Sequence, residues 1–391
     1  MKIHPLLKMS LLASGGLFFL VLAAFVVLLI YDLHTQRLYT AMPDTHNLTE
    51  QINKMGTDYL AGRPNGALVI AFYQNGKQSF QGFGKISGAN TNPPNAHTIF
   101  EIGSVTKIFT AAILEKMADD GAVKLDDPIS LYLPKDVVSP KKNGHEITLG
   151  NLATHTSGLP RLPENLLETA NDQQNPYANY TTEDLYKSLA TVQLNSELGK
   201  KSVYSNYGYG LLGKILELKA GKPYETLIQE MICSPLGLKN TTTKLSAEQK
   251  EQLTPGHSPQ GEIVSNWDFD ALAGCGAIRS DADDLLKFVE ANLNKTNAEI
   301  YKVLNETQKN HFKTFTGGIG LGWQIENEIE EITLHWHNGG TGGYVSFVGF
   351  DKQNQVGVVI LSNYGDAWAR DSSVDQMGMK LLKIGSKVSL E

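Results

Sequence analysis

Cysteine and charge are both scarce in this 391-residue sequence. It has two cysteines, Cys233 and Cys275, which are too few for a disulfide-rich fold. Both stand among apolar residues, so we expect buried free thiols, with a single disulfide as the alternative. Charged residues make up 19% of the chain, the formal net charge is −7, and no basic run follows residue 31, which argues against nucleic-acid binding. Internal repeats are also absent, so we expect an ordinary globular core rather than a repeat architecture.

One long hydrophobic run lies near the start of the chain. Met9–Tyr31 contains no charged side chain and exceeds the roughly 20 residues that cross a bilayer as a helix. Lys2 and Lys8 precede it and Asp32 follows it, so the positive-inside rule predicts a cytoplasmic N-terminus and an uncleaved membrane anchor. A cleaved signal peptide is the alternative, although no small-x-small cleavage site follows the run. Both interpretations place the rest of the chain outside the cytoplasm, in the periplasm or at the cell surface.

Patterns typical of β-strands occur towards both ends of the sequence. Asn75-Gly76 between the first two strands predicts a type I′ hairpin turn. The expected strands are Ala67–Tyr73, Lys77–Lys85, Glu331–His337, Tyr344–Phe350 and Gln355–Ser362. Helical patterns lie before, between and after these strands, and Ser280 is expected to cap the third helix. The expected helices are Thr49–Ala61, Val105–Met117, Ser280–Asn292 and Gln376–Ile384.

The middle of the chain has a different character. Helical patterns alternate there with proline and glycine, and the polar segment Glu168–Thr182 is predicted to be a long surface loop. An antiparallel sheet flanked by N- and C-terminal helices, with an inserted all-helical domain, is an α+β arrangement. The expected parts are a cytoplasmic tail (1–8), an anchor or signal segment (9–31), a linker (32–47), a sheet domain (48–125 and 271–385) and a helical domain (126–270). We expect the site in a cleft between the last two parts.

Ser104 and Lys107 form the most informative pair of the sequence. A serine hydroxyl becomes a good nucleophile when a neighbour takes its proton, and a lysine three residues later on a helix shares its face. Gly103 and the apolar run after Ser104 predict a sharp turn into a buried helix, whose positive dipole end favours an oxyanion. Ser139 and Lys142 have the same spacing, but their context predicts an exposed loop. The alternative for Lys107 is a structural side chain that reaches out to solvent.

Tyr204 and Asn206 supply two further polar groups. A tyrosine hydroxyl beside a lysine ammonium can take the proton of the serine and return it to the leaving group. Asn206 both donates and accepts hydrogen bonds, so it can orient the lysine and a substrate together. Simple packing of an aromatic run that includes Tyr207 and Tyr209 is the alternative interpretation.

The segment from His335 to Tyr344 combines two histidines with four glycines. Strand alternation places His335 and His337 on one face, but zinc needs a third protein ligand and no partner motif accompanies them, so we expect no metal. Gly339 and Gly340 fit a strand edge left bare for a substrate backbone. A backbone N–H at this edge would complete an oxyanion hole with that of Ser104.

Three motifs resemble, in order and approximate spacing, the active-site motifs of the serine β-lactamase and penicillin-binding protein superfamily. The Tyr-x-Asn form is similar to that of class C β-lactamases and the DD-peptidases and esterases related to them. The stretches 149–160 and 273–285 look like the same family, and the resemblance covers roughly residues 47–382. It implies a β-lactamase/transpeptidase-like fold with its site between a sheet domain and an all-helical domain, and no cofactor. The three motifs are Ser104-x-x-Lys107, Tyr204-x-Asn206 and His337-x-Gly339.

The resemblance also implies roles for these residues and makes some departures visible. Ser104 would be the acylated nucleophile, Lys107 and Tyr204 would share the base and acid roles, and Asn206, His337, Gly339 and Gly340 would bind substrate. His337 stands where β-lactamases usually carry lysine, and we expect it to attract a substrate carboxylate mainly when protonated. Asn338 replaces a Thr or Ser whose hydroxyl often helps to bind that carboxylate, and Cys275 replaces a common glycine.

Three functions follow from these residues. The first is an extracytoplasmic serine hydrolase that acts through an acyl-enzyme on cell-wall-type peptides or amides, similar to a D-alanyl-D-alanine carboxypeptidase. The second is a β-lactamase or carboxylesterase with the same site. The third is a penicillin-binding or scaffolding protein without turnover, which the intact motifs disfavour because a binding module does not need Lys107 or Tyr204. The expected partners are a small-molecule or peptide substrate and, through the N-terminal segment, the membrane.

Overall fold

The computed structural model describes residues 47–172, 174–294, 298–327, 332–365, 374–388 and 390. The expected tail, anchor and nearly all of the linker fall in residues 1–46, outside the described residues. Within the described ranges, no helix is both long enough and apolar enough to cross a membrane.

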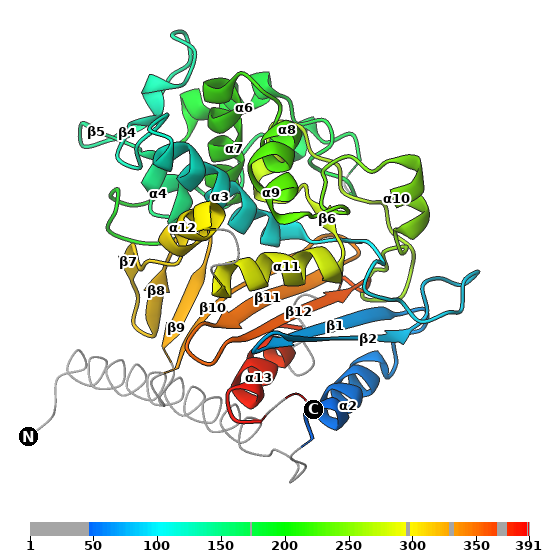
Figure 1. Ribbon diagram of the computed structural model, residues 1–391. Helices are drawn as coiled ribbons and strands as arrows, with labels where there is room; N and C mark the ends of the chain where they lie inside the picture. The colour runs from blue at the N-terminus through cyan, green and yellow to red at the C-terminus, as the bar shows by residue number, and fades with distance from the viewer. Residues whose placement is uncertain are drawn as a thin grey trace, which may run out of the picture. The chain divides into compact units, whose positions relative to one another are not determined.

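An antiparallel sheet of eight described strands forms the centre of this part of the chain (Figure 1). Its order, β2-β1-β12-β11-β10-β9-β8-β7, places the first hairpin beside the last strand. The strands are β1 Ala67–Gln74, β2 Lys77–Gly84, β7 Phe312–Lys313, β8 Gly317–Ile319, β9 Gln324–Asn327, β10 Thr333–Gly340, β11 Val345–Asp351 and β12 Val356–Ser362. The five predicted strands are confirmed, and Asn75 and Gly76 have the positive φ angles, 49° and 86°, of a type I′ turn.

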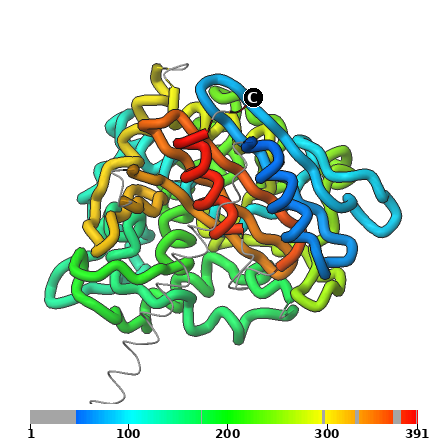
Figure 2. Tube along the Cα trace, turned by 90° about the horizontal axis from the view of Figure 1, so that it is seen from below, coloured from blue at the N-terminus to red at the C-terminus, as the bar shows by residue number. Residues whose placement is uncertain are grey.

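Helices cover both faces of the sheet, which explains why every residue of β1, β11 and β12 is buried. Figures 1 and 2 show α2 (Leu48–Leu60) and α13 (Val374–Gly385) side by side on one face, where they pack on β1, β2, β11 and β12. Helix α11 (Ala282–Leu293) packs on the other face. Side chains therefore alternate along β1. Leu68 packs in the apolar layer under α2 and α13, and Val69 packs in the layer on the α11 face.

Helix α3 (Thr106–Asp119) separates the sheet layer from the helical middle of the chain (Figure 1). Its residues from Thr106 to Leu114 are all buried, as the apolar run predicts. It packs against α7 and against α12 (Ala298–Thr307). Cys233 and Cys275, both in this interior, are buried free thiols, as expected.

The helical middle of the chain contains seven described α-helices. They are α4 Leu149–Ala153, α5 Leu166–Thr169, α6 Thr182–Thr191, α7 Asn206–Ala220, α8 Tyr224–Ile228, α9 Ser234–Leu236 and α10 Ala247–Gln252. The segment Glu168–Thr182 differs from the predicted surface loop, because Tyr177 and Tyr180 within it are only 4% and 0% exposed. The domain boundaries at residues 125 and 270 stay a prediction.

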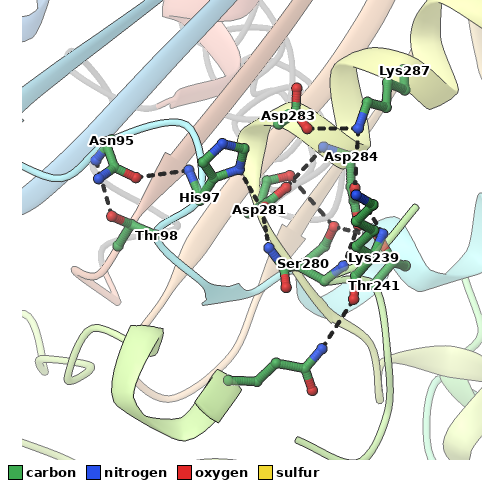
Figure 3. Close-up of polar contacts among 12 residues, drawn as sticks. Asn95, His97, Thr98, Lys239, Thr241, Ser280, Asp281, Asp283, Asp284 and Lys287 are labelled. Atoms are coloured by element: carbon green, nitrogen blue, oxygen red, sulfur yellow. Dashed lines mark hydrogen bonds and ion pairs between the residues drawn. The ribbon is translucent and has the colours of Figure 1, made fainter. Parts of the chain in front are cut away.

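A polar network connects the start of α11 to residues 239–241 of the helical region (Figure 3). The carboxylate of Asp281 caps α11 by accepting from the Asp284 backbone N–H at 2.8 Å, so the prediction that Ser280 is the cap was wrong by one residue. Ser280 lies instead in a short strand, where its hydroxyl is 2.8 Å from that of Thr241. Asp284 in turn accepts from the Lys239 backbone N–H at 3.1 Å. All these groups have partners, so the network is structural.

Candidate active site

The turn that carries Ser104 is pressed against the end of strand β10. It is one 3₁₀ turn, Gly103–Val105, between the short strand β3 (Phe100–Glu101) and α3. Gly103 has φ +48°, and a Cβ atom there would lie 2.7 Å from the backbone nitrogen of Gly340. A Cβ atom at Gly339 would lie 2.0 Å from the carbonyl oxygen of residue 102. Glycine on both sides therefore brings the main chains of Ser104 and Gly340 together.

Lys107 connects three separate parts of the chain to the serine. It lies in the first turn of α3 and is completely buried, which excludes the alternative of a side chain that reaches solvent. Its ammonium donates to Ser104 Oγ at 3.1 Å, to Asn206 Oδ1 at 2.8 Å and to the Cys275 carbonyl oxygen at 2.8 Å. These three acceptors match the three N–H groups of a lysine ammonium. A buried charge is tolerated here because every donor is used.

Tyr204 and Asn206 reach the same place from the start of α7. Ser205 between them is the N-cap, and its hydroxyl accepts from the Gly208 backbone N–H at 2.9 Å. The Tyr204 ring centre lies 4.8 Å from the Lys107 ammonium nitrogen. The N-terminal turns of α3 and α7 thus meet at the lysine, and the predicted grouping of these residues is confirmed in the structure.

His155, which the sequence analysis did not single out, holds the backbone on both sides of Tyr204. Its carbonyl oxygen accepts from the Val203 N–H at 2.8 Å, and its Nδ1 accepts from the Ser205 N–H at 3.0 Å. Its ring packs on that of Tyr204 with 4.6 Å between centres. Burial, and next the charge of Lys107, hold the pKa of His155 well below its usual value, so the ring stays neutral and Nδ1 can accept. The only signal in the sequence was its place in the family-like stretch 149–160.

Shortening His155 should therefore slow turnover more than it weakens binding. We expect His155→Asn, whose amide oxygen can replace Nδ1 as acceptor, to lower kcat about tenfold, and His155→Ala about 100-fold. Steady-state kinetics would show KM nearly unchanged in both. If His155 acts by positioning Tyr204, His155→Asn should add little in a Tyr204→Phe background. Equal losses in both backgrounds would contradict this role.

His337 is a buried, neutral group in β10. It is 2% exposed, its Nδ1 lies 2.6 Å from the Asn338 carbonyl oxygen, and its Nε2 has no hydrogen-bond partner among the described residues. Burial, and next the Lys107 charge, lower the pKa of His337 to about 3. This low pKa argues against the expectation that a protonated His337 attracts a substrate carboxylate, because desolvation penalises the imidazolium. Its ring centre is 6.3 Å from that of Tyr204, and its role in substrate binding stays a prediction.

His335, on the same face of β10, belongs to the packing of the core. Its ring stacks on Phe350 with centres 5.1 Å apart, and its Nε2 is 3.1 Å from the Gln308 carbonyl oxygen. Burial lowers the pKa of His335 to about 4. In the part of the chain that the structure describes, no three His, Cys, Asp or Glu side chains are grouped so that they could hold a metal ion.

A cavity of about 550 Å³ opens above Ser104. Tyr204 and Asn206 line it beside the serine, and β10 contributes residues 338–340. Tyr177 and Trp267, whose ring centres are 5.2 Å apart, form an aromatic wall. The sequence analysis missed both, because they lie in loops and no motif accompanies them.

Two charged side chains, among the described residues, line this cavity. Arg161 comes from the helical region, and its guanidinium carbon lies 5.0 Å from the Tyr204 ring centre. Asp375 comes from the first turn of α13 and accepts a hydrogen bond from Asn338 Nδ2 at 2.8 Å. Burial raises the pKa of Asp375 to about 6. The sequence analysis missed both residues as well.

The arrangement has the parts that acyl transfer requires. A serine hydroxyl contacts a buried amine at 3.1 Å, a tyrosine lies beside that amine, and bare backbone at Gly340 adjoins the backbone of Ser104. An open cavity gives a substrate access to the serine. The individual roles of Ser104, Lys107 and Tyr204 stay predictions that kinetics must test.

Comparison with known proteins agrees with this geometry. Residues 54–375 match the Beta-lactamase family. The D-alanyl-D-alanine-carboxypeptidase/endopeptidase AmpH of Escherichia coli K12 is 30% identical over 324 residues, which are 78% of this chain and 80% of that protein. A β-lactamase of Pseudomonas fluorescens is 27% identical over 328 residues, which are 76% of this chain and 88% of that protein.

Solved structures show the same fold. A β-lactamase/D-alanine carboxypeptidase from Yersinia pestis, complexed with citrate, has a TM-score of 0.71 and 25% identity over 85% of this chain and 99% of its own. A class C β-lactamase from Rhodobacter sphaeroides has a TM-score of 0.72 at 22% identity, over 85% of this chain and 98% of its own, which is evidence for the fold alone. The resemblance and the α+β fold predicted from the sequence are confirmed. The chain belongs to the Beta-lactamase family and is a serine hydrolase of that family.

Proposed function

We propose that this protein hydrolyses cell-wall-type peptides or related amides through an acyl-enzyme on Ser104. The observation that carries the proposal is the 3.1 Å contact between Lys107 Nζ and Ser104 Oγ at the floor of a cavity open to substrate. The Lys107–Tyr204 pair can take the serine proton once one of its two groups is deprotonated, and acyl transfer by this route needs no metal or cofactor.

In this proposal one member of the Lys107–Tyr204 pair starts deprotonated, Ser104 Oγ attacks the scissile carbonyl carbon, and the serine proton passes to that deprotonated group. The carbonyl oxygen becomes an oxyanion that accepts from the backbone N–H groups of Ser104 and Gly340. The proton then goes to the leaving nitrogen, the C–N bond breaks and the acyl group stays on Ser104. Water, deprotonated by the same pair, then attacks the acyl carbon of the ester. The bond between that carbon and Ser104 Oγ breaks, the serine takes the proton back, and the acyl group leaves as a carboxylic acid. Asn206 holds Lys107 through its Oδ1 during these steps.

The substrate class is supported by the relatives, and His337 bears on the charge of the substrate. The relative at 30% identity is named a D-alanyl-D-alanine-carboxypeptidase/endopeptidase. A neutral histidine at the position of the usual β-lactamase lysine removes a permanent positive charge that would attract a carboxylate, whether of a β-lactam or of a peptide C-terminus, and so favours amides that lack one. The β-lactamase relatives keep hydrolysis of β-lactams, or of esters, as the second candidate.

A side-by-side assay tests this proposal. The purified protein would be given a fluorescent penicillin, a fluorophosphonate, a peptide ending in D-Ala-D-Ala and a chromogenic cephalosporin. We expect labelling by the penicillin, release of D-alanine from the peptide and slow turnover of the cephalosporin. Rapid β-lactam turnover without peptide hydrolysis would favour the second candidate, and no reaction with any of the four would contradict both.

We further propose that Met9–Tyr31 holds the protein in the membrane with the catalytic part outside the cytoplasm. The uncharged run after Lys2 and Lys8 motivates this proposal. Protease added to spheroplasts should digest the catalytic part, while in intact, untreated cells the full-length chain should remain in the membrane fraction. A shortened, soluble mature form would indicate a cleaved signal peptide, and protection from the protease would contradict the topology.

A further inference from the structure

We infer that Asp375 and Asn338 form an acceptor subsite in the cavity, which favours a protonated amine, an amide N–H or a hydroxyl of the substrate and disfavours a free carboxylate. The inference rests on the proposed function, because it concerns the substrate of the same site. The subsite would make the enzyme select between substrates that differ in charge at one terminus. Peptides that are amidated, cross-linked or extended at this end would be preferred over free acids.

The geometry places this pair within the substrate cavity. Asn338 lies in β10 immediately before the two glycines that adjoin the Ser104 turn, and it lines the same cavity as Ser104. Its amide donates to one oxygen of the Asp375 carboxylate at 2.8 Å, and a carboxylate partner fixes which end of the amide is the nitrogen. The other carboxylate oxygen has no hydrogen-bond partner among the described residues. The pair therefore offers acceptors to a ligand.

The negative charge of Asp375 is not compensated by a described cation. No ion pair joins it within the described ranges, and the two influences on its pKa are burial, which raises it, and the Asn338 hydrogen bond, which lowers it. The neighbouring His337 is neutral. The Lys107 ammonium is enclosed by its three oxygen partners and does not line the cavity. An acidic group in a substrate cavity, with no counter-ion among the described residues, is a candidate for recognition of a complementary group.

The cation that lines the cavity belongs to the other half of the fold. Arg161 comes from the helical region and packs on the Tyr204 ring, whereas Asp375 comes from α13, which covers the sheet. The described lining of the cavity is thus positive on its helical side, at Arg161, and negative on its sheet side, at Asp375. A substrate with one carboxylate gains most by directing it to Arg161, which leaves its neutral or cationic end for Asp375 and Asn338.

Matched peptides and one isosteric variant test the inference. The peptides share one sequence and differ at the C-terminus as free acid, carboxamide or aminoethyl amide, and a second set carries an acetyl or a succinyl group at the N-terminus. Binding would be measured with Ser104→Ala protein, and kcat/KM with the wild type. Asp375→Asn keeps an acceptor for Asn338 and removes the charge. Asp58→Asn, on the exposed surface of α2, removes the same charge elsewhere.

One terminus of the peptide should face Asp375. For that terminus we expect protein with Asp375 intact to favour the neutral peptide over its carboxylate counterpart about tenfold, because the carboxylate peptide brings a second negative charge beside Asp375. If that end is the C-terminus, the aminoethyl amide should bind tighter still. Asp375→Asn should reduce the preference to within about twofold, and Asp58→Asn should leave it unchanged. Equal or tighter binding of the carboxylate peptide by Ser104→Ala protein that keeps Asp375, at both ends, would overturn the inference whether or not the Asp375→Asn variant folds.

The two proposals fail in different ways. If wild-type protein hydrolyses no peptide but Ser104→Ala protein still shows the charge preference, the proposed function fails and the subsite stands. If peptides are hydrolysed and the preference is the same in Asp375→Asn as in wild type, the subsite is refuted and the proposed function stands.

Discussion

Replacing Ser104 with alanine should abolish covalent labelling by the fluorescent penicillin and the fluorophosphonate, and should lower peptide hydrolysis by roughly 10⁴- to 10⁶-fold. The reason is that Ser104 Oγ is the nucleophile beside Lys107 in the cavity, and no other described residue combines a hydroxyl with that contact. Labelling followed by gel fluorescence and intact mass would measure the loss. Stability should change little, because Lys107 keeps its bonds to Asn206 and Cys275.

Ser139→Ala is the matched control for this experiment. Ser139 has the same spacing to a lysine, Lys142, but Ser139 Oγ has no hydrogen-bond partner among the described residues, and the Lys142 ammonium donates instead to the Leu194 carbonyl oxygen at 2.9 Å. The variant should be labelled and should turn over substrate at the wild-type rate. A covalent adduct on Ser104→Ala protein would show that another residue is the nucleophile.

The contrast between these two serines shows what the sequence could establish about the site. Spacing alone could not separate Ser104 from Ser139. The apolar run after Ser104 could separate them, because a helix that is apolar on every side is buried, and a lysine on that helix is then buried as well. Tyr204 and Asn206 lie about 100 residues after Ser104 in the chain, and their place in the same site was supported by the motif resemblance. No local pattern specifies that α3 and α7 meet.

Properties that depend on distant neighbours were harder to predict. The pKa of His337 depends on its enclosure in the core and on the charge of Lys107, which is 230 residues away in the chain, so strand alternation could not reveal it. Arg161 and Asp375 belong to the cavity only because the helical region and α13 are brought to the same edge of β10. Isolated charged residues in sequence are usually solvated, and nothing in their local sequence distinguishes these two.

Short elements were also missed, for a simpler reason. Strands β7, β8 and β9 have only two, three and four residues, too few for an alternating pattern to emerge. They extend the sheet beyond β10 but pair with it only at Thr333–Trp336, so the half of β10 that carries the glycines pairs, among the described strands, with β11 alone. The expected bare strand edge at Gly339 and Gly340 is therefore present at this end of β10, beside the Ser104 turn.

Replacing Tyr204 with phenylalanine should lower kcat by roughly 10²- to 10⁴-fold and leave KM nearly unchanged, because the change removes a proton-transfer group but not a surface. The ring should keep its place, since it is held by packing on His155 and Arg161 and by the backbone bonds of His155. Single-turnover experiments would show whether acylation, deacylation or both are slowed. Slowing of both steps is expected if one hydroxyl relays the proton in each.

Tyr209→Phe is the control within the same aromatic run. The Tyr209 ring also lies near the Lys107 ammonium, at 5.6 Å, but its hydroxyl donates to the Ala153 carbonyl oxygen at 2.6 Å in the core. Its loss should cost about 1–3 kcal/mol of stability, because a buried acceptor loses its partner, and should leave kcat within about threefold of wild type. A Tyr204→Phe effect as small as that would assign proton transfer to Lys107 or to water, since both rings lie near the same ammonium and only Tyr204 lines the cavity.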